Sequence, residues 1–210
     1  MKKQLLIALA VLFTAVTLAQ TTPEKKESKF EFQVNAKVGF ARLKQTGLVS
    51  LNGNINGSDL LLSYKISRKW DVASGVSFLQ FDGNPTIGGE TASIRNSYLQ
   101  IPVRFTGDFN IFDTTEPKDP KIIFNIGLGL YANTLLKQEL ETVTGNSDTK
   151  NLGWNFGFTS AVGLKFLLTD ALNVGLGLES QSEFTKMKKD GAEQRIEQSN
   201  SMYLKVGFTF

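Results

Sequence analysis

The sequence predicts an all-β protein: an eight-stranded, antiparallel, up-and-down transmembrane β-barrel preceded by a cleaved signal peptide. Three observations lead to this prediction. Apolar and polar residues alternate in eight segments, the connections between these segments alternate between long and short, and the last segment alternates as far as an aromatic final residue, Phe210. After the N-terminal leader, no segment has the periodicity of a helix.

The C-terminal stretch, residues 199–210, organises the predicted fold. Its apolar face carries Met202, Leu204, Val206, Phe208 and Phe210, and its other face carries Tyr203, Lys205, Gly207 and Thr209. A strand is not stable alone, so this one must pair backward, and the first strand, residues 30–43, is the most economical partner. That pairing closes a barrel.

The chain opens with the features of an export signal. Lys2 and Lys3 precede an almost wholly apolar run from Leu5 to Ala19, and cleavage is expected after Ala19 or Gln20. A single-pass anchor is the alternative, but the fifteen residues of this run are fewer than the roughly 20 that a spanning helix needs. We therefore expect a signal peptide at 1–19, a periplasmic tail at 20–29 and a single barrel domain at 30–210.

The composition excludes several classes of function. Without Lys2 and Lys3, 21 of the 23 basic residues remain against 20 acidic ones, so the mature chain is nearly neutral and no nucleic-acid partner is expected. The chain has no Cys, which excludes disulfides and a lipid-modified cysteine, and no His, the commonest general base. No metal-ligand spacing appears either. We expect no enzyme activity, no cofactor and no metal.

Seven further segments alternate before the C-terminal strand. They lie at residues 30–43, 60–66, 70–78, 99–105, 122–130, 154–168 and 172–178. Four connections are long and rich in Gly, Asn, Ser and charge: 44–57, 82–91, 137–152 and 185–197. Three-residue turns are expected at 67–69 and 169–171, whereas the connection 107–121 is longer than a tight hairpin. This alternation of lengths is typical of membrane barrels.

Alternation alone does not say which face points outward, so a soluble exported ligand-binding barrel is a remote alternative. Roughly forty large apolar side chains would not fit inside eight strands, which favours placing them in lipid. The opposite face then lines a packed lumen whose charges are Glu31, Lys37, Lys65, Asp71, Arg104, Lys165, Glu179 and Lys205. Because an isolated charge there is costly, we expect pairing of Lys65 with Asp71 and of Glu179 with Lys205.

Aromatic residues fall near both ends of the predicted strands, as two interfacial girdles require. With the N-terminus in the periplasm, Trp70, Phe105, Phe166 and Phe210 lie on the periplasmic side, and Trp154, Phe40, Phe78 and Phe184 lie on the outer side. Core packing of these rings in a soluble fold is the alternative.

One short motif resembles a known family. The stretch from Asn96 to Phe105 contains Tyr98, Leu99, Ile101 and Pro102, and is similar to the Tyr-Leu-x-Ile-Pro signature of the PorT-like outer-membrane β-barrel family. This resemblance implies an eight-stranded barrel of the OmpA/OmpX type, delivered by the outer-membrane assembly machinery. Gln100 stands where that family often has an acidic residue. Since Pro102 removes a ladder donor, we expect a β-bulge there, with a functional kink as the alternative.

Two classes of function remain. The first is a non-enzymatic anchor or interaction scaffold in the outer membrane, with both termini in the periplasm. Its partners would be membrane lipid, the assembly machinery acting on the C-terminal strand, and a protein at the outer loops. The alternative, implied by the PorT-like resemblance, is an accessory role in protein secretion or transport. A loop such as 186–190 is either a lipid-headgroup contact or a solvated charge run.

Overall fold

The computed structural model describes residues 29–46, 50–87, 89–112, 121–142 and 145–210. The predicted signal peptide and nearly all of the predicted tail lie outside these residues. Within them, no helix is long and apolar enough to cross a membrane.

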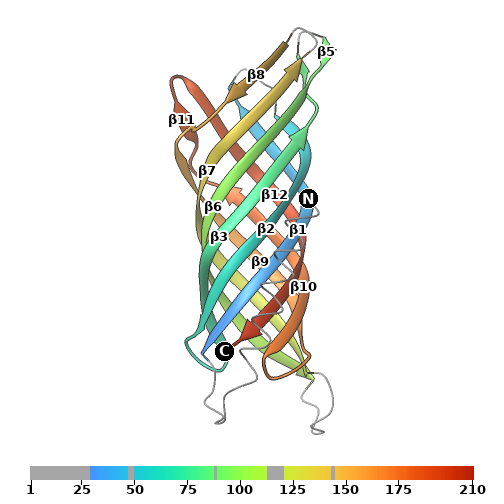
Figure 1. Ribbon diagram of the computed structural model, residues 1–210, viewed down its shortest axis with the longest axis vertical. Coiled ribbons are helices and arrows are strands. Elements are labelled where there is room, and N and C mark those ends of the chain that lie inside the picture. Colours follow the sequence, from blue (N-terminus) through green and yellow to red (C-terminus); the bar gives the residue numbers. More distant parts are fainter. Residues whose placement is uncertain (1–28, 47–49, 88, 113–120, 143–144) are drawn as a thin grey trace.

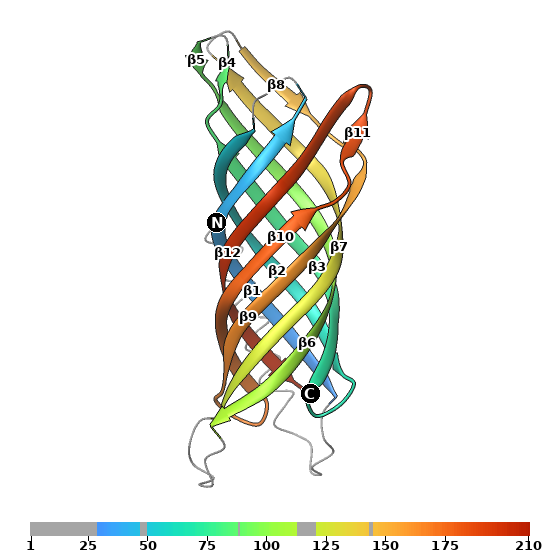
Figure 2. The same ribbon diagram turned by 180° about the vertical axis from the view of Figure 1, so that it is seen from behind.

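The described residues form one closed ring of eight long antiparallel strands, as predicted (Figure 1). The final pairing of β12 with β1 closes the ring, and Figure 2 shows the barrel from behind. In chain order the strands are β1 (Phe30–Gln45), β2 (Leu51–Lys65), β3 (Trp70–Gly83), β6 (Ser93–Phe112), β7 (Lys121–Thr142), β9 (Trp154–Leu167), β10 (Leu172–Glu183) and β12 (Ala192–Thr209).

The two ends of the barrel differ. Phe30 and Phe210 meet at one end, where the Phe210 amide donates to the Phe30 carbonyl at 2.9 Å; we call it the terminal end, and the opposite one the distal end. Short additional strands lie at the distal end, at the top of Figure 1. These are β4 (Thr86–Ile87), β5 (Glu90–Thr91), β8 (Gly145–Thr149) and β11 (Met187–Lys189).

The short turns at the terminal end are as predicted. The Ile66 amide donates to the Trp70 carbonyl at 2.9 Å, and the Leu168 amide donates to the Leu172 carbonyl at 2.9 Å. Each bond closes a three-residue turn, at 67–69 and at 169–171. The register that follows sets Lys65 directly opposite Asp71.

The four long loops of the prediction are wrong, because most of their residues are strand. β2 begins at Leu51 and β7 continues to Thr142, while the stretch from 185 to 197 contains β11 and the start of β12. In these segments the alternation continues, but it is reversed, with apolar residues inside and polar residues outside. Strands predicted from outward-facing apolar residues are therefore too short, because this pattern stops before the strands do.

Along most of the barrel the apolar face points outward, which is the arrangement predicted for a membrane barrel. Leu128 on β7 and Leu176 on β10 are 52% and 48% exposed. The inward positions of the same region are buried and polar, as Asn35, Gln100 and Asn133 illustrate.

Toward the distal end the pattern inverts. The inward side chains there form one buried cluster, the distal core, of Ala41, Leu43, Ile55, Leu79, Phe81, Ile94, Tyr98, Leu135, Leu152, Met187 and Ile196. The outward positions beside them are exposed and polar, for example Arg42, Asn54 and Arg95. A wall that is apolar outside suits lipid, whereas one that is apolar inside suits water. The inversion therefore marks one boundary of the membrane.

Pro102 is accommodated without the predicted bulge. The β3–β6 register is the same on both sides of it, at Ser74↔Val103 and at Ser77↔Gln100, so the ladder is interrupted but not shifted. Pro102 remains opposite Tyr131 on the other side, and the Ser74 hydroxyl donates to the Pro102 carbonyl at 2.9 Å. A side-chain donor thus bonds this carbonyl beside the gap that proline leaves in the ladder.

Candidate functional site

Four charged side chains meet in the middle of the lumen and alternate in sign. Lys37 Nζ lies 2.9 Å from Asp59 and 2.7 Å from Glu179, and Arg104 lies 3.3 Å from Asp59 and 2.8 Å from Glu179. The four residues come from β1, β2, β6 and β10, so this central charge ring ties together strands from all around the barrel. Its formal charge is zero, as a buried cluster requires.

Amide side chains extend the central charge ring. Asn35 donates to Asp59 at 2.9 Å, and Gln181 donates to Glu179 at 2.7 Å. Gln100, on β6, donates to Gln181 at 3.3 Å. These hydrogen bonds stabilise the ring, because charge pairing alone does not offset the free-energy cost of removing carboxylates from water.

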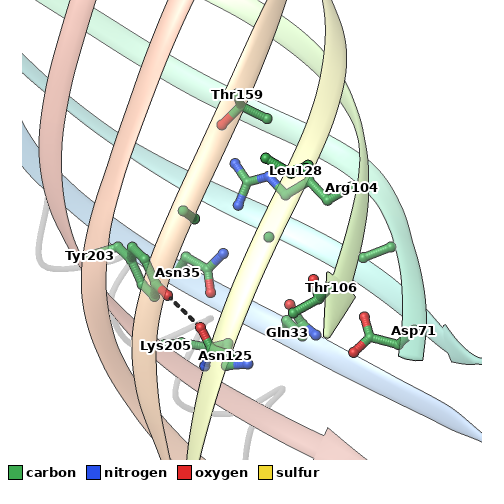
Figure 3. A pocket seen from close by; sticks show the side chains of 13 residues that line it. Gln33, Asn35, Asp71, Arg104, Thr106, Asn125, Leu128, Thr159, Tyr203 and Lys205 are labelled. Carbon is green, nitrogen blue, oxygen red and sulfur yellow. Dashed lines mark hydrogen bonds between the residues drawn. The ribbon is translucent and has the colours of Figure 1, made fainter. Parts of the chain in front are cut away.

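A second polar layer fills the terminal end of the lumen. Lys165 contacts Asp108, Lys205 Nζ lies 3.8 Å from Glu31, and the Ser63 hydroxyl donates to Asp71 at 2.8 Å. Between this layer and the central ring lies a cavity of about 40 Å³ (Figure 3). Polar side chains from six strands line it, and the Tyr203 hydroxyl donates to Asn125 across one side at 3.2 Å. Its size suits a few water molecules and nothing larger.

A third layer separates the central ring from the distal core. Glu183 is buried there, and its carboxylate accepts hydrogen bonds from the Asn133 amide at 2.7 Å and from the Ile196 backbone N–H at 2.5 Å. Beyond it the distal core closes the lumen with apolar side chains. Apart from the small cavity beside the central charge ring, side chains therefore fill the lumen.

Seven of the eight predicted lumen charges point inward: Glu31, Lys37, Asp71, Arg104, Lys165, Glu179 and Lys205. Lys65 has the same parity but lies exposed at the terminal rim, where the strand leaves the membrane. Although it stands opposite Asp71, the hydrogen bond recorded for Asp71 comes from Ser63. Parity thus gives the face of a side chain and not its contacts.

The predicted pair of Glu179 with Lys205 is wrong. The β10–β12 register sets Glu179 opposite Ser201 and Lys205 opposite Gly175, so the two are four positions apart rather than two. A shift of two residues keeps every side chain on its face but changes its neighbours. Glu179 instead contacts Lys37 and Arg104, and Lys205 approaches Glu31.

Three lumen acids were missed by the sequence analysis: Asp59, Asp108 and Glu183. Each lies just outside a predicted strand, but on the parity of its inward neighbours. Extending the period-two pattern by a few residues would have found them.

The eight predicted girdle residues all lie on the outer wall. Phe166 is half-buried, and the other seven are exposed. At the terminal end Trp70 stacks on Phe105 with ring centroids 4.9 Å apart, and Phe30 stacks on Phe210 at 6.2 Å. Phe109 joins the first pair in a T-shaped contact, with its ring centroid 6.0 Å from that of Trp70.

The motif residues alternate between the two sides of β6. Tyr98 and Pro102 are buried inside, whereas Leu99 is half-buried and Ile101 exposed on the outer wall. The Tyr98 hydroxyl accepts a hydrogen bond from Asn96 at 2.9 Å and donates to Gln194 at 3.2 Å. Tyr98 therefore links the polar lumen to the distal core, in which it packs.

The acidic side chains of the lumen lie apart from one another or beside cations. Within the described residues, no group of three or more potential ligands among His, Cys, Asp and Glu gathers in one place. The carboxylates of the central ring are held by Lys37 and Arg104, so they serve as structural partners of these cations.

The filled lumen predicts that the purified monomer conducts no ions in planar bilayers. Ions would have to cross both the central charge ring and the distal core, and an eight-stranded barrel has no spare width for an aqueous channel. Single-channel recording checks this, with a large porin as the positive control. Stable, stepwise conductance from the monomer would contradict a filled lumen.

A closed ring of eight antiparallel strands, with an apolar outer band and a polar filled interior, defines an outer-membrane β-barrel. The chain belongs to the outer membrane protein beta-barrel domain family, whose model matches residues 6–210. It is therefore an outer-membrane protein of the Gram-negative type. The sequence matches no curated protein.

Solved structures of similar fold agree with this assignment. The outer-membrane protein OprG from Pseudomonas aeruginosa is 13% identical over 88% of this chain and 97% of its own, with a TM-score of 0.56. Neisserial surface protein A is 15% identical over 85% and 97%, with a TM-score of 0.50. At these identities the likeness concerns the fold alone, and the PorT-like resemblance stays a prediction.

Proposed function

We propose that the protein is a non-enzymatic anchor that holds a rigid β-platform outside the membrane for interaction with a partner. The observation that carries this proposal is the inversion of the apolar face toward the distal end. We call the distal platform the part of the wall beyond that inversion, together with β8 and β11.

The strands are longer than a membrane requires. β6 has 20 residues and β7 has 22, whereas a transmembrane strand needs about 9–11. Part of this excess lies at the distal end. On β2, the nine residues from Leu51 to Asp59 lie beyond the outward-facing Leu60 and, at about 3.3 Å each and tilted by about 40°, correspond to roughly 20 Å of wall. A plain anchor has no use for such an extension.

Packing makes the distal platform rigid. Phe81, Ile94 and Leu43 are almost wholly buried in the distal core, so the extension has an interior like that of a small soluble barrel. Ion pairs between neighbouring strands lie on its outside, among them Arg95 with Asp82 at 2.8 Å and Lys188 with Glu193 at 3.1 Å. Such exposed pairs add little stability but keep the surface soluble and specific.

We further propose that both termini lie in the periplasm and that the distal platform faces the exterior. In this orientation β12 ends at the periplasmic side, and the exposed Phe210 that follows it would be accessible there to the outer-membrane assembly machinery. A PorT-like role in secretion would use the platform or the terminal end, because the lumen is filled.

Cysteine labelling on intact cells tests this orientation. The chain has no native Cys, so Lys189→Cys on β11 and Arg68→Cys in the β2–β3 turn each create a unique thiol. A membrane-impermeant maleimide should label Lys189→Cys on whole cells and Arg68→Cys only after the outer membrane is opened. The reverse pattern would refute the orientation.

In-cell crosslinking tests the interaction role. A photoreactive residue at Lys137 or Lys189 should give a discrete protein adduct, whereas the same residue at the lipid-facing Leu128 should give none. Equal adduct patterns at all three positions would overturn the proposal, because the distal platform would then have no selective partner.

A further inference from the structure

A cluster of amide side chains surrounds one exposed aromatic ring just above the apolar band. Phe40 on β1 is 69% exposed, and its register partners are Asn54 on β2 and Asn200 on β12. The next outward residue, Arg42, lies between Asn52 and Gln198. We call the amide patch the set Phe40, Arg42, Asn52, Asn54, Asn56, Gln198 and Asn200.

The amide patch lies where the wall leaves the membrane. Along β2 the outward residues are first Tyr64, Leu62 and Leu60. Ser58 follows, and from Asn56 onward the outward residues are amides. Successive outward residues are about 6.7 Å apart, so the amides begin within two such steps of Leu60, at the edge of the apolar band.

The amides are open to a ligand. Within the described residues, the side-chain hydrogen bond recorded for the patch runs from Arg42 Nε to Asn52 Oδ1, at 3.3 Å. Each amide offers a donor and an acceptor in one group, which matches the hydroxyls of a saccharide. The exposed Phe40 ring supplies a flat apolar surface beside them, suited to the C–H face of a sugar ring.

The charges nearby favour an anionic saccharide. Arg42, Lys44 and Arg195 lie near Glu197, which Arg195 contacts at 3.0 Å and Lys44 at 3.8 Å. The next acid along β12, Glu193, is already paired with Lys186 and Lys188. Across β2, Asp82 is paired with Arg95 at 2.8 Å. A phospholipid headgroup would need cations alone, whereas five amides indicate hydroxyls beside the phosphate.

We propose that the amide patch binds the phosphorylated saccharide headgroup of a glycolipid in the surrounding outer leaflet. The acyl chains would lie against the apolar band below, at Val38 and Leu60, so the site continues the lipid-facing surface. This inference rests on the proposed orientation, which places the distal end outside.

The test uses the full barrel in nanodiscs of phosphatidylcholine that contain a small fraction of lipopolysaccharide with a phosphorylated core saccharide. Native mass spectrometry after mild extraction counts the glycolipid molecules held per barrel. Asn54→Ala/Asn56→Ala should reduce apparent affinity about tenfold, since two hydrogen-bonding groups are lost. The matched control, Asn146→Ala on β8, removes an exposed amide elsewhere and should change nothing.

Two further measurements separate the contribution of the phosphate from that of the saccharide. Arg42→Ala should weaken retention of the phosphorylated glycolipid severalfold, but not of a dephosphorylated one, whereas Arg68→Ala at the terminal end should have no effect. Phosphatidylglycerol, which is anionic but lacks a sugar, should not compete.

Three results would overturn the inference: equal retention by the Asn54→Ala/Asn56→Ala and Asn146→Ala variants, full competition by phosphatidylglycerol, or binding of the free core oligosaccharide without enrichment of the glycolipid. Whole-cell labelling of Lys189→Cys separates the two proposals. If that thiol is labelled from outside and no glycolipid is retained, this inference alone fails.

Discussion

Replacing Glu179 by Gln is expected to destabilise the barrel by about 3–5 kcal/mol, because it removes one of the two acids that hold Lys37 and Arg104 in the central charge ring. The remaining ring would carry a formal charge of +1 in a closed interior. Urea unfolding in lipid vesicles measures the loss in the free energy of unfolding.

A second substitution should restore the stability of this variant. Lys37→Met removes the excess charge and leaves Arg104 paired with Asp59, so the double variant should recover much of the loss. As a matched control, Glu139→Gln, at a half-buried position on the outer wall, should cost less than about 1 kcal/mol. Simple additivity of Glu179→Gln and Lys37→Met would show that the two side chains do not interact.

Replacing Phe81 by Ala should cost about 3–5 kcal/mol, because Phe81 is 0% exposed and packs in the distal core. The cavity left behind would lie in the part of the wall outside the lipid, where no acyl chain can fill it. The same unfolding assay measures the effect, and near-ultraviolet circular dichroism reports whether the core stays ordered.

The matched control lies three residues earlier on the same strand. Phe78 points to the outer wall and is 48% exposed, so Phe78→Ala should lose less than about 2 kcal/mol as lipid moves into the vacated space. Equal losses for the two variants would mean that the distal core is not a packed interior.

The sequence was sufficient for the barrel because membrane strands obey a strict parity. Phe40, Leu128 and Leu204 could be assigned to the outer wall from alternation alone, and each is exposed there. The turn at 67–69 followed from the same rule, since Ile66 and Trp70 had to share a face.

The distal end could not be predicted in this way. At Ile55 and Phe81 the apolar residues change sides, because the solvent outside changes from lipid to water. The prediction assumed that apolar residues face lipid along each whole strand, and it therefore assigned residues 44–57 and 137–152 to loops. The inversion itself, from Leu60 outward-facing to Ile55 inward-facing on β2, was visible in the sequence.

The contacts within the lumen were also beyond sequence reasoning. Glu179 meets Lys37 and Arg104 from strands that are far apart in the chain, and this depends on the stagger of the whole ring. Parity showed which charged side chains face the lumen. To pair them, the register between the strands had to be known without an error of two residues.

We infer that one and the same wall faces lipid along its middle and water at its distal end. Unique cysteines along β2, at 52, 54 and 56 and at 60, 62 and 64, can carry spin labels because the chain has no Cys of its own. Collision with a water-soluble nickel complex and with oxygen in lipid vesicles then reports the solvent at each position. We expect nickel to reach 52, 54 and 56 and oxygen to dominate at 60, 62 and 64, with a label at Ile55 shielded from both. Oxygen dominance as far as position 52, or nickel access at 62, would contradict a wall that changes solvent between Leu60 and Asn56.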